Sequence, residues 1–245
     1  MQKDDSNNNL LNDPESIPVV ILAGGQSQRL RLNNQYKWQL PFADNGTLLN
    51  YIIGKISKQS KHVLINAPFI SSEKVDSPGY DNNYNDLNTY FLPIIHDILP
   101  NFQGPLAGLL TSLKWAKDHN HPWVMTLACD TPFFPDDLLS QLSKQVQTLN
   151  KNNTTSDKLA ITVSSQDRIH PTFGLWSTEL LPLLNNHIQI NSNEKRLRSI
   201  SLWAQKHAAI IKIKSTHNKS NDYDPFFNIN TPDEYQQALT IITNV

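Results

Sequence analysis

Hydrophobic and polar positions along the chain follow two alternating patterns. Apolar, β-branched runs of about four to eight residues are typical of buried strands. Between them, apolar residues recur at three- and four-residue spacing, which predicts amphipathic helices. The predicted strands are 17–23, 62–66, 90–97, 122–129, 159–163, 170–176 and 208–214, and the predicted helices are 47–59, 104–117, 135–149, 177–188, 194–205 and 230–242.

This alternation of strands and helices favours an α/β fold in which a mostly parallel sheet is flanked by helices on both faces. Ligands of such sheets bind beyond the carboxyl ends of the strands. The loops that follow Ala23, Asn66, Asp97 and Cys129 should therefore lie at one edge of the sheet. That edge is the expected functional site.

Polar segments divide the chain. Residues 1–16 are acidic and rich in asparagine, which predicts a disordered tail, and residues 17–245 are predicted to form a single domain. Residues 71–88 are rich in Ser, Asn and Asp and are predicted to be a long surface loop. The last helix should begin with a capping box formed by Thr231 and Glu234.

Composition and charge exclude several classes of function. A formal net charge of -1 gives no overall attraction to nucleic acid or anionic membranes, so neither is an expected partner. Cys129 is the only cysteine, which excludes an intrachain disulfide and a cysteine-rich metal cluster. No apolar run approaches the roughly 18 residues of a membrane span, and residues 1–16 lack the pattern of a signal peptide. We therefore expect a cytoplasmic protein.

A glycine-containing loop with cations follows the first strand. Gly24 and Gly25 allow the backbone to approach a ligand, and Arg29 and Lys37 can neutralise a phosphate group. The stretch matches neither the dinucleotide fingerprint nor the P-loop. An anion site is one interpretation of the glycine pair, and a simple turn is the other.

Carboxylates and amides stand at the ends of other predicted strands. Asp130 follows the strand 122–129, where it suits Mg²⁺, and Asp97 follows the strand 90–97. Asn228 and Asn230 precede the last helix, and their amide oxygens can ligate Mg²⁺ or bind a phosphate-bearing group. Each of these residues is also common in ordinary turns. Together they predict Mg²⁺-dependent nucleotide chemistry without a covalent intermediate.

Seven stretches of the chain are "VILAGGQSQRL", "INA", "IIHD", "GPLAGLL", "CDTPF", "HPTFGLW" and "FFNINTPDEY". Together they resemble the molybdenum cofactor guanylyltransferase family. They occur in the order typical of that family and cover about residues 17–243. The resemblance implies a Rossmann-like nucleotidyltransferase that transfers GMP from GTP to molybdopterin with Mg²⁺ and releases pyrophosphate. It also implies molybdopterin-handling proteins and recipient molybdoenzymes as partners.

The residues themselves and the resemblance together predict roles for individual side chains. Lys37, Arg29 and Asp130 would be catalytic, and Asp130 would bind the metal. Asn228 and Asn230 would lie on the pterin or metal side of the site. The nucleotide-binding set would be Leu22, Ala23, Gly24, Gly25, Lys37, Asn66, Asp97 and Asp130.

The stretch from Arg29 to Lys37 departs from the family pattern. The family usually has a sequence close to R-M-G-x-D-K, whereas here "LRLNNQYK" follows Arg29, the glycine is missing and Tyr36 replaces the usual acid. In an alternative alignment Arg31 supplies the cation. Two other functions stay open: a cytidylyltransferase for the same pterin, and a non-catalytic carrier of nucleotide or cofactor. The sequence favours the guanylyltransferase, because the cytidylyl enzymes tend to have "LAAG" where this chain has "LAGG".

Overall fold

The computed structural model describes most of the chain outside its loops. The described residues are 11–24, 36–44, 46–68, 89–99, 104–151, 159–191, 199–213, 216–218 and 221–243. The predicted loop 71–88 lies outside them. No helix among the described residues has both the length and the apolar character needed to cross a membrane.

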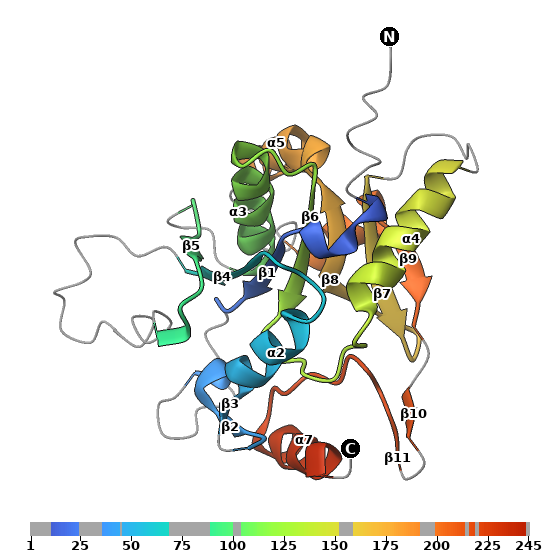
Figure 1. Ribbon diagram of the computed structural model, residues 1–245. Coiled ribbons are helices and arrows are strands. Elements are labelled where there is room, and N and C mark those ends of the chain that lie inside the picture. The colour runs from blue at the N-terminus through green and yellow to red at the C-terminus, as the bar shows by residue number, and fades with distance from the viewer. Residues whose placement is uncertain are drawn as a thin grey trace, which may run out of the picture.

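A seven-stranded sheet forms the centre of the molecule (Figure 1). Its spatial order is β5-β4-β1-β6-β8-β7-β9, and within it only β8 runs against the direction of the other strands. The sheet is therefore mostly parallel, as predicted. The strands are β1 (Val19–Leu22), β4 (Val63–Ala67), β5 (Ile94–His96), β6 (Trp123–Ala128), β7 (Ala160–Ser165), β8 (Arg168–Ser177) and β9 (Ala209–Lys212).

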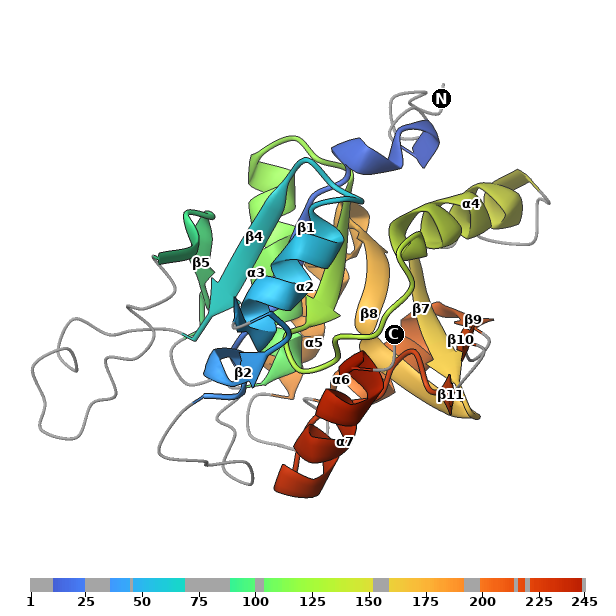
Figure 2. The ribbon, with the colours of Figure 1, turned by 60° about the horizontal axis from the view of Figure 1, so that its bottom comes forward.

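Helices cover both faces of the sheet (Figure 2). The buried side chains of β1 alternate between the two faces, so Val19 and Ile21 pack in one core and Val20 and Leu22 in the other. One core contains residues of α2 (Leu48–Ile56), α4 (Leu138–Lys151) and α7 (Pro232–Thr243). The other contains residues of α3 (Pro105–Asp118), α5 (Leu181–Ile190) and α6 (Ile200–His207).

Short elements complete the described chain. Their bounds are η1 (Pro14–Ser16), η2 (Lys37–Gln39), η5 (Thr178–Leu180), the hairpin of β2 (Pro41–Phe42) with β3 (Gly46–Thr47), and the hairpin of β10 (Thr216–Asn218) with β11 (Asn221–Tyr223). Neither hairpin was predicted from the sequence. The seven predicted strands and six predicted helices each correspond to a described element, although their ends are shifted. Residues 194–198 of the predicted helix 194–205 lie outside the described residues.

The predicted boundary of the disordered tail is wrong at its C-terminal end. Leu11 is only 1% exposed and belongs to the core beside α4. Its carbonyl oxygen accepts hydrogen bonds from Ser143 Oγ at 2.6 Å and from Gln147 Nε2. Residues 14–16 then form η1. Residues 11–16 are ordered because one apolar side chain is buried and its backbone is hydrogen-bonded, a contact that local composition does not reveal.

The strand β8 contains an irregularity that bears on the site. Its pairing with β7 shifts between Thr162 and Val163, so that residues 171–173 have no partner in the register. Thr162 Oγ1 donates a hydrogen bond to the Phe173 carbonyl at 2.9 Å, and Thr126 Oγ1 donates one to the Thr172 carbonyl at 2.9 Å. These hydroxyls satisfy backbone oxygens that the interrupted ladder leaves free. Thr172, one of residues 171–173, also belongs to the site described below.

Candidate active site

A cavity of about 210 Å³ lies at the carboxyl ends of β1, β4, β5 and β6. Parallel strands end at the same edge of a sheet, so residues that are far apart in the sequence meet here. The edge predicted from the sequence is therefore the edge that carries this cavity. Its lining consists of Leu22, Gly24, Lys37, Trp38, Asn66, Asp97, Gly104, Pro105, Ala128, Cys129, Asp130, Thr172 and Asn228.

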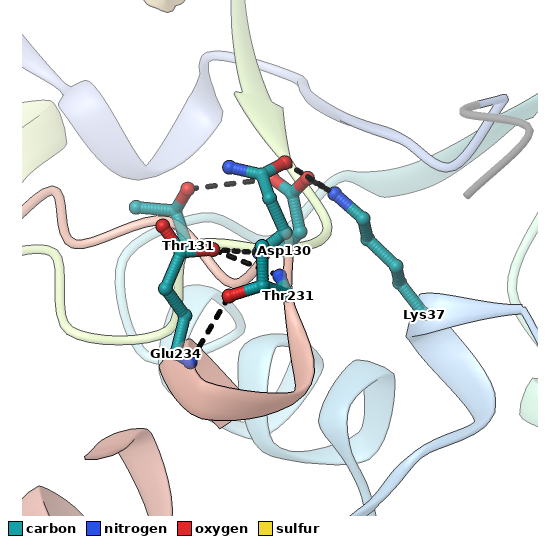
Figure 3. Close-up of polar contacts among 6 residues, drawn as sticks. Lys37, Asp130, Thr131, Thr231 and Glu234 are labelled. Atoms are coloured by element: carbon teal, nitrogen blue, oxygen red, sulfur yellow. Dashed lines mark hydrogen bonds and ion pairs between the residues drawn. The ribbon is translucent and has the colours of Figure 1, made fainter. Parts of the chain in front are cut away.

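Lys37, Asp130 and Asn230 form a polar cluster beside the cavity. Figure 3 shows the Lys37 side chain pointing toward Asp130. The ammonium group of Lys37 lies 2.8 Å from Asp130 Oδ2 and donates a second hydrogen bond to Asn230 Oδ1 at 2.6 Å. The side chains of Lys37 and Asp130 are 13% and 17% exposed. Because water is largely excluded, this ion pair is screened less than a surface pair.

The start of α7 holds Asn230 in this cluster. The amide of Ile229 donates a hydrogen bond to the Asp130 carbonyl at 2.9 Å, which ties the C-terminal segment to the end of β6. Thr231 and Glu234 form the predicted capping box: the Glu234 carboxylate accepts from the Thr231 amide at 2.8 Å, and Thr231 Oγ1 accepts from the Glu234 amide at 3.2 Å. The carboxylate also accepts from the Asn230 amide at 2.7 Å. The cap thus fixes the backbone that carries the Asn230 side chain.

Asn66 and Asp97 form a second buried pair on the other side of the cavity. Asn66 Nδ2 donates to Asp97 Oδ1 at 2.9 Å, and the two residues are 2% and 7% exposed. Burial raises the pKa of Asp97, against the smaller effects of hydrogen bonds from Asn66 and Thr111 and of the charge on His96. This pair offers a carboxylate and an amide to a ligand that enters the cavity.

Gly104 and Pro105 form the wall beside this pair. Gly104 precedes α3 with φ +110°, a left-handed conformation that side chains disfavour, and Pro105 occupies the first turn of the helix. The "GPLAG" stretch therefore brings bare backbone to the cavity and starts α3 there. This arrangement suits a flat or phosphate-bearing ligand that must approach the main chain.

Two buried polar atoms of the lining residues have no hydrogen-bond partner within the described part of the chain. They are Asn228 Oδ1 and the indole nitrogen of Trp38. An unpaired buried acceptor or donor costs free energy, so such atoms are places where a ligand can add a hydrogen bond. Asn228 was predicted as a site residue. Trp38 was missed, because its aromatic side chain has no polar signature beyond its position next to Lys37.

The sequence-predicted residues fall into three groups. Lys37 joins Asp130 and Asn230 in the first group, and Asn66 and Asp97 form the second. The third group, Leu22, Gly24 and Asn228, lines the cavity. The buried Ala23 lies beside it, and its amide donates a hydrogen bond to the Asn66 carbonyl. Gly25, Arg29 and Arg31 lie outside the described residues. Thr172 lines the cavity but was missed, although Pro171 inside a predicted strand was a signal for a bulge.

Cys129 has no chemistry to contribute. It is buried and has a free thiol, and burial raises its pKa far above the ordinary value. A thiol that stays protonated is a poor nucleophile. Cys129 is therefore a core residue.

The donor set beside Lys37 fits a hard divalent cation. Within the described residues no group of three or more His, Cys, Asp or Glu side chains could hold a metal. Asp130 and the amide oxygens of Asn230 and Asn228 are nevertheless oxygen donors, and the Asn228 oxygen is buried without a partner among the described residues. Magnesium is commonly bound by one or two carboxylates together with phosphate oxygens of the substrate and water.

Comparison with known proteins agrees with this site. A family model, described as the MobA-like NTP transferase domain, matches residues 19–208. The chain belongs to this family. This membership confirms the resemblance to molybdenum cofactor guanylyltransferases and the α/β nucleotidyltransferase fold.

Individual relatives match nearly the whole chain. A molybdenum cofactor guanylyltransferase of Mesorhizobium japonicum is 31% identical over 230 residues, which are 94% of this chain and 97% of that protein. One of Brucella melitensis is 31% identical and covers 92% of both chains. The solved structure of molybdopterin-guanine dinucleotide biosynthesis protein A from Archaeoglobus fulgidus aligns with a TM-score of 0.64 at 19% identity, over 94% of this chain and 100% of that one.

Proposed function

We propose that this protein transfers GMP from GTP to the terminal phosphate of molybdopterin, giving molybdopterin guanine dinucleotide and pyrophosphate. The observation that carries the proposal is the meeting of Lys37, Asp130 and Asn230 at the mouth of a cavity whose other side holds Asn66 and Asp97. This arrangement places a cation and oxygen donors next to a separate polar pair. The names of the relatives at 31% identity supply the choice of substrates.

The nucleotide would lie along the first loop and the buried pair. Gly24 offers close approach of the backbone, and Asn66 and Asp97 offer hydrogen-bonding groups for the ribose or the base. Lys37 would bind phosphate oxygens, and the sequence adds Arg29 as a second cation and Gly25 as a further loop residue. The pterin would enter from the side of Asn228 and Thr172, where the Asn228 oxygen, which has no partner among the described residues, can accept a hydrogen bond from the N–H groups of the pterin.

The transfer itself is a direct displacement at phosphorus. An oxygen of the pterin phosphate forms a bond to the α-phosphorus of GTP, and the bond from that phosphorus to the bridging oxygen of the β-phosphate breaks, so pyrophosphate leaves with the electron pair. The attacking phosphate is already ionised at neutral pH, so no strong general base is required. Lys37 would offset negative charge on the leaving group. A magnesium ion held by Asp130, with Asn228 or Asn230, would supply Lewis-acid stabilisation of the phosphate oxygens.

The experiment is a pyrophosphate-release assay on the purified full chain with MgCl₂. GTP and CTP are compared with and without molybdopterin. The proposal predicts release with GTP that requires molybdopterin. Preference for CTP would make the protein a cytidylyltransferase on the same fold, and nucleotide binding without release under any condition would make it a carrier.

A further inference from the structure

The ammonium group of Lys37 occupies the oxygens that a divalent cation requires. It donates to Asp130 Oδ2 at 2.8 Å and to Asn230 Oδ1 at 2.6 Å. A carboxylate and an amide oxygen are hard ligands of the type that Mg²⁺ and Mn²⁺ take, at about 2.0–2.2 Å. Two cations cannot use these same oxygens together at such distances, because their mutual repulsion in a poorly solvated site is large.

Among the described residues that line the cavity, one carboxylate besides Asp130 could help to hold both cations. The other carboxylate that lines the cavity, Asp97, accepts a hydrogen bond from Asn66 at 2.9 Å and lies at the end of a different strand. Asp130 and Lys37 together carry no net charge. A bare divalent cation therefore meets a neutralised carboxylate at this place rather than an anionic one.

Lys37 has an alternative partner once a nucleotide is bound. Its side chain is long and flexible and carries three donors, and phosphate oxygens are strong acceptors for an ammonium group. If Lys37 turns to a phosphate, Asp130 and Asn230 lose their shared donor. Their oxygens then become available to the metal in the same step that brings the nucleotide in.

We infer that Lys37 acts as a placeholder for the metal: it competes with divalent cations for Asp130 and Asn230, and nucleotide phosphate favours the metal by drawing Lys37 away. The inference rests on the proposed function, since it requires a phosphate-bearing substrate in this cavity. Lys37 is thereby a positioning residue for metal entry in addition to its contact with phosphate. Metal and nucleotide bind cooperatively as a result, and by linkage each raises the affinity for the other by the same factor.

The first test measures Mn²⁺ binding without nucleotide, by electron paramagnetic resonance of the free ion. The variants are Lys37→Met and, as a matched control, Lys55→Met, because Lys55 pairs with Asp136 at 2.7 Å outside the cavity lining. We expect Lys37→Met to bind Mn²⁺ about 5- to 150-fold more tightly than the wild type, the usual range of a coupling between sites. Lys55→Met should bind as the wild type does. Equal or weaker binding by Lys37→Met overturns the inference.

The second test follows the movement of Lys37 in the wild-type chain and does not depend on that variant. Lysine acylation is quantified by mass spectrometry in MgCl₂ and in KCl of the same ionic strength. Labelling of Lys37 should rise several-fold in MgCl₂, whereas Lys114, which pairs with Asp118 on the surface at 2.9 Å, should not respond. In Asp130→Asn, labelling of Lys37 should be high in both salts. Protection of Lys37 that persists at saturating Mg²⁺ overturns the inference.

These outcomes separate the inference from the proposed function. Neither the Mn²⁺ titration nor the labelling requires turnover or molybdopterin. If the protein transfers no GMP but shows both effects, the inference about Lys37 stands and the proposed reaction is wrong. If the protein transfers GMP while Lys37 stays protected at saturating Mg²⁺, the proposed reaction stands and the inference about Lys37 is wrong.

Discussion

Gly108 packs against Asn66 with no room for a side chain. A Cβ atom on Gly108 would lie 2.6 Å from Asn66 Oδ1 and 2.8 Å from Leu22 Cδ2. Asn66 in turn donates the hydrogen bond that holds Asp97. The glycine on α3 therefore sets the position of the polar pair on the proposed nucleotide side of the cavity.

Gly108→Ala should disturb this pair. The close contact forces Asn66 or Leu22 to shift, so we expect a loss of about 1–3 kcal/mol in the free energy of unfolding, as in other overpacked sites. The Kd for GTP should rise about tenfold, or about 1.4 kcal/mol. Urea denaturation and a GTP titration measure the two effects.

Gly54→Ala is the matched control, because a Cβ atom on this helical glycine of α2 meets nothing within 4 Å. Alanine should stabilise the protein by about 0.5–1 kcal/mol through helix propensity and leave the Kd for GTP unchanged. If Gly108→Ala bound GTP as tightly as the wild type, the close contact would have no role in ordering Asn66.

Lys37→Met should lower kcat for pyrophosphate release. Removal of one group that stabilises developing phosphate charge typically costs about 10²- to 10³-fold in kcat. The measurement is steady-state release with saturating GTP, molybdopterin and Mg²⁺. Lys55→Met, which removes a mostly buried lysine that pairs with Asp136 and is not part of the cavity lining, should keep the wild-type rate. Full activity of Lys37→Met would show that Lys37 takes no part in the reaction.

Leu11→Ala tests the corrected boundary of the ordered chain. Leu11 is 1% exposed in the core beside α4, so its truncation leaves a cavity. We expect the free energy of unfolding to fall by about 2–5 kcal/mol. Leu183→Ala, at a position that is 44% exposed, should change it by less than about 0.5 kcal/mol. Similar losses of unfolding free energy in both variants would show that Leu11 is not packed in the core and that residues 11–16 belong to the disordered tail.

His170 gives the protein a pH-dependent stability. Its Nε2 lies 2.8 Å from Ser165 Oγ and its ring stacks on Phe226 with 4.9 Å between centroids. Burial lowers the pKa of His170 below its ordinary value of 6.5, although the charge of Asp224 acts in the opposite direction; Arg168 lowers it further. The unfolded chain therefore takes up a proton at a higher pH than the folded chain does.

Consequently, the contribution of His170 to stability is complete above pH 6.5 and is lost as the pH falls through the lowered pKa of the folded state. His170→Gln removes this titration. Urea midpoints at pH 7.5 and 5.5 should differ less for His170→Gln than for the wild type. An equal difference in the two proteins would show that His170 is not protected from protonation.

The sequence predicted most of the sheet because apolar periodicity is local, but it could not predict the direction of β8. The turn between β7 and β8 consists of Gln166 and Asp167, both with positive φ, as in a tight hairpin. Such turns are usually recognised by Asn-Gly or Asp-Gly, and "QD" has no glycine. The antiparallel pairing was therefore hidden, although both strands were predicted.

The residues of the site were likewise predictable only where the pattern in the sequence is local. Glycine and carboxylate residues at strand ends were recognisable, because the ends of parallel strands share one edge. The contact of Lys37 with Asn230, across 193 residues, depends on how α7 is capped against the end of β6. Thr172 lines the cavity because β8 pairs antiparallel with β6, and Thr126 Oγ1 donates a hydrogen bond to its carbonyl oxygen. Contacts of this kind arise from tertiary packing and leave no periodic pattern in the sequence.

The most direct test of the proposed reaction is the mass of the pterin product. The purified chain is incubated with molybdopterin, Mg²⁺ and equal concentrations of GTP and CTP, beside the Asp130→Asn variant. If the proposed reaction is correct, we expect a pterin that has gained one GMP unit, little CMP product, and no detectable product from Asp130→Asn. An unmodified pterin, a pterin that carries CMP, or full product from Asp130→Asn would contradict it.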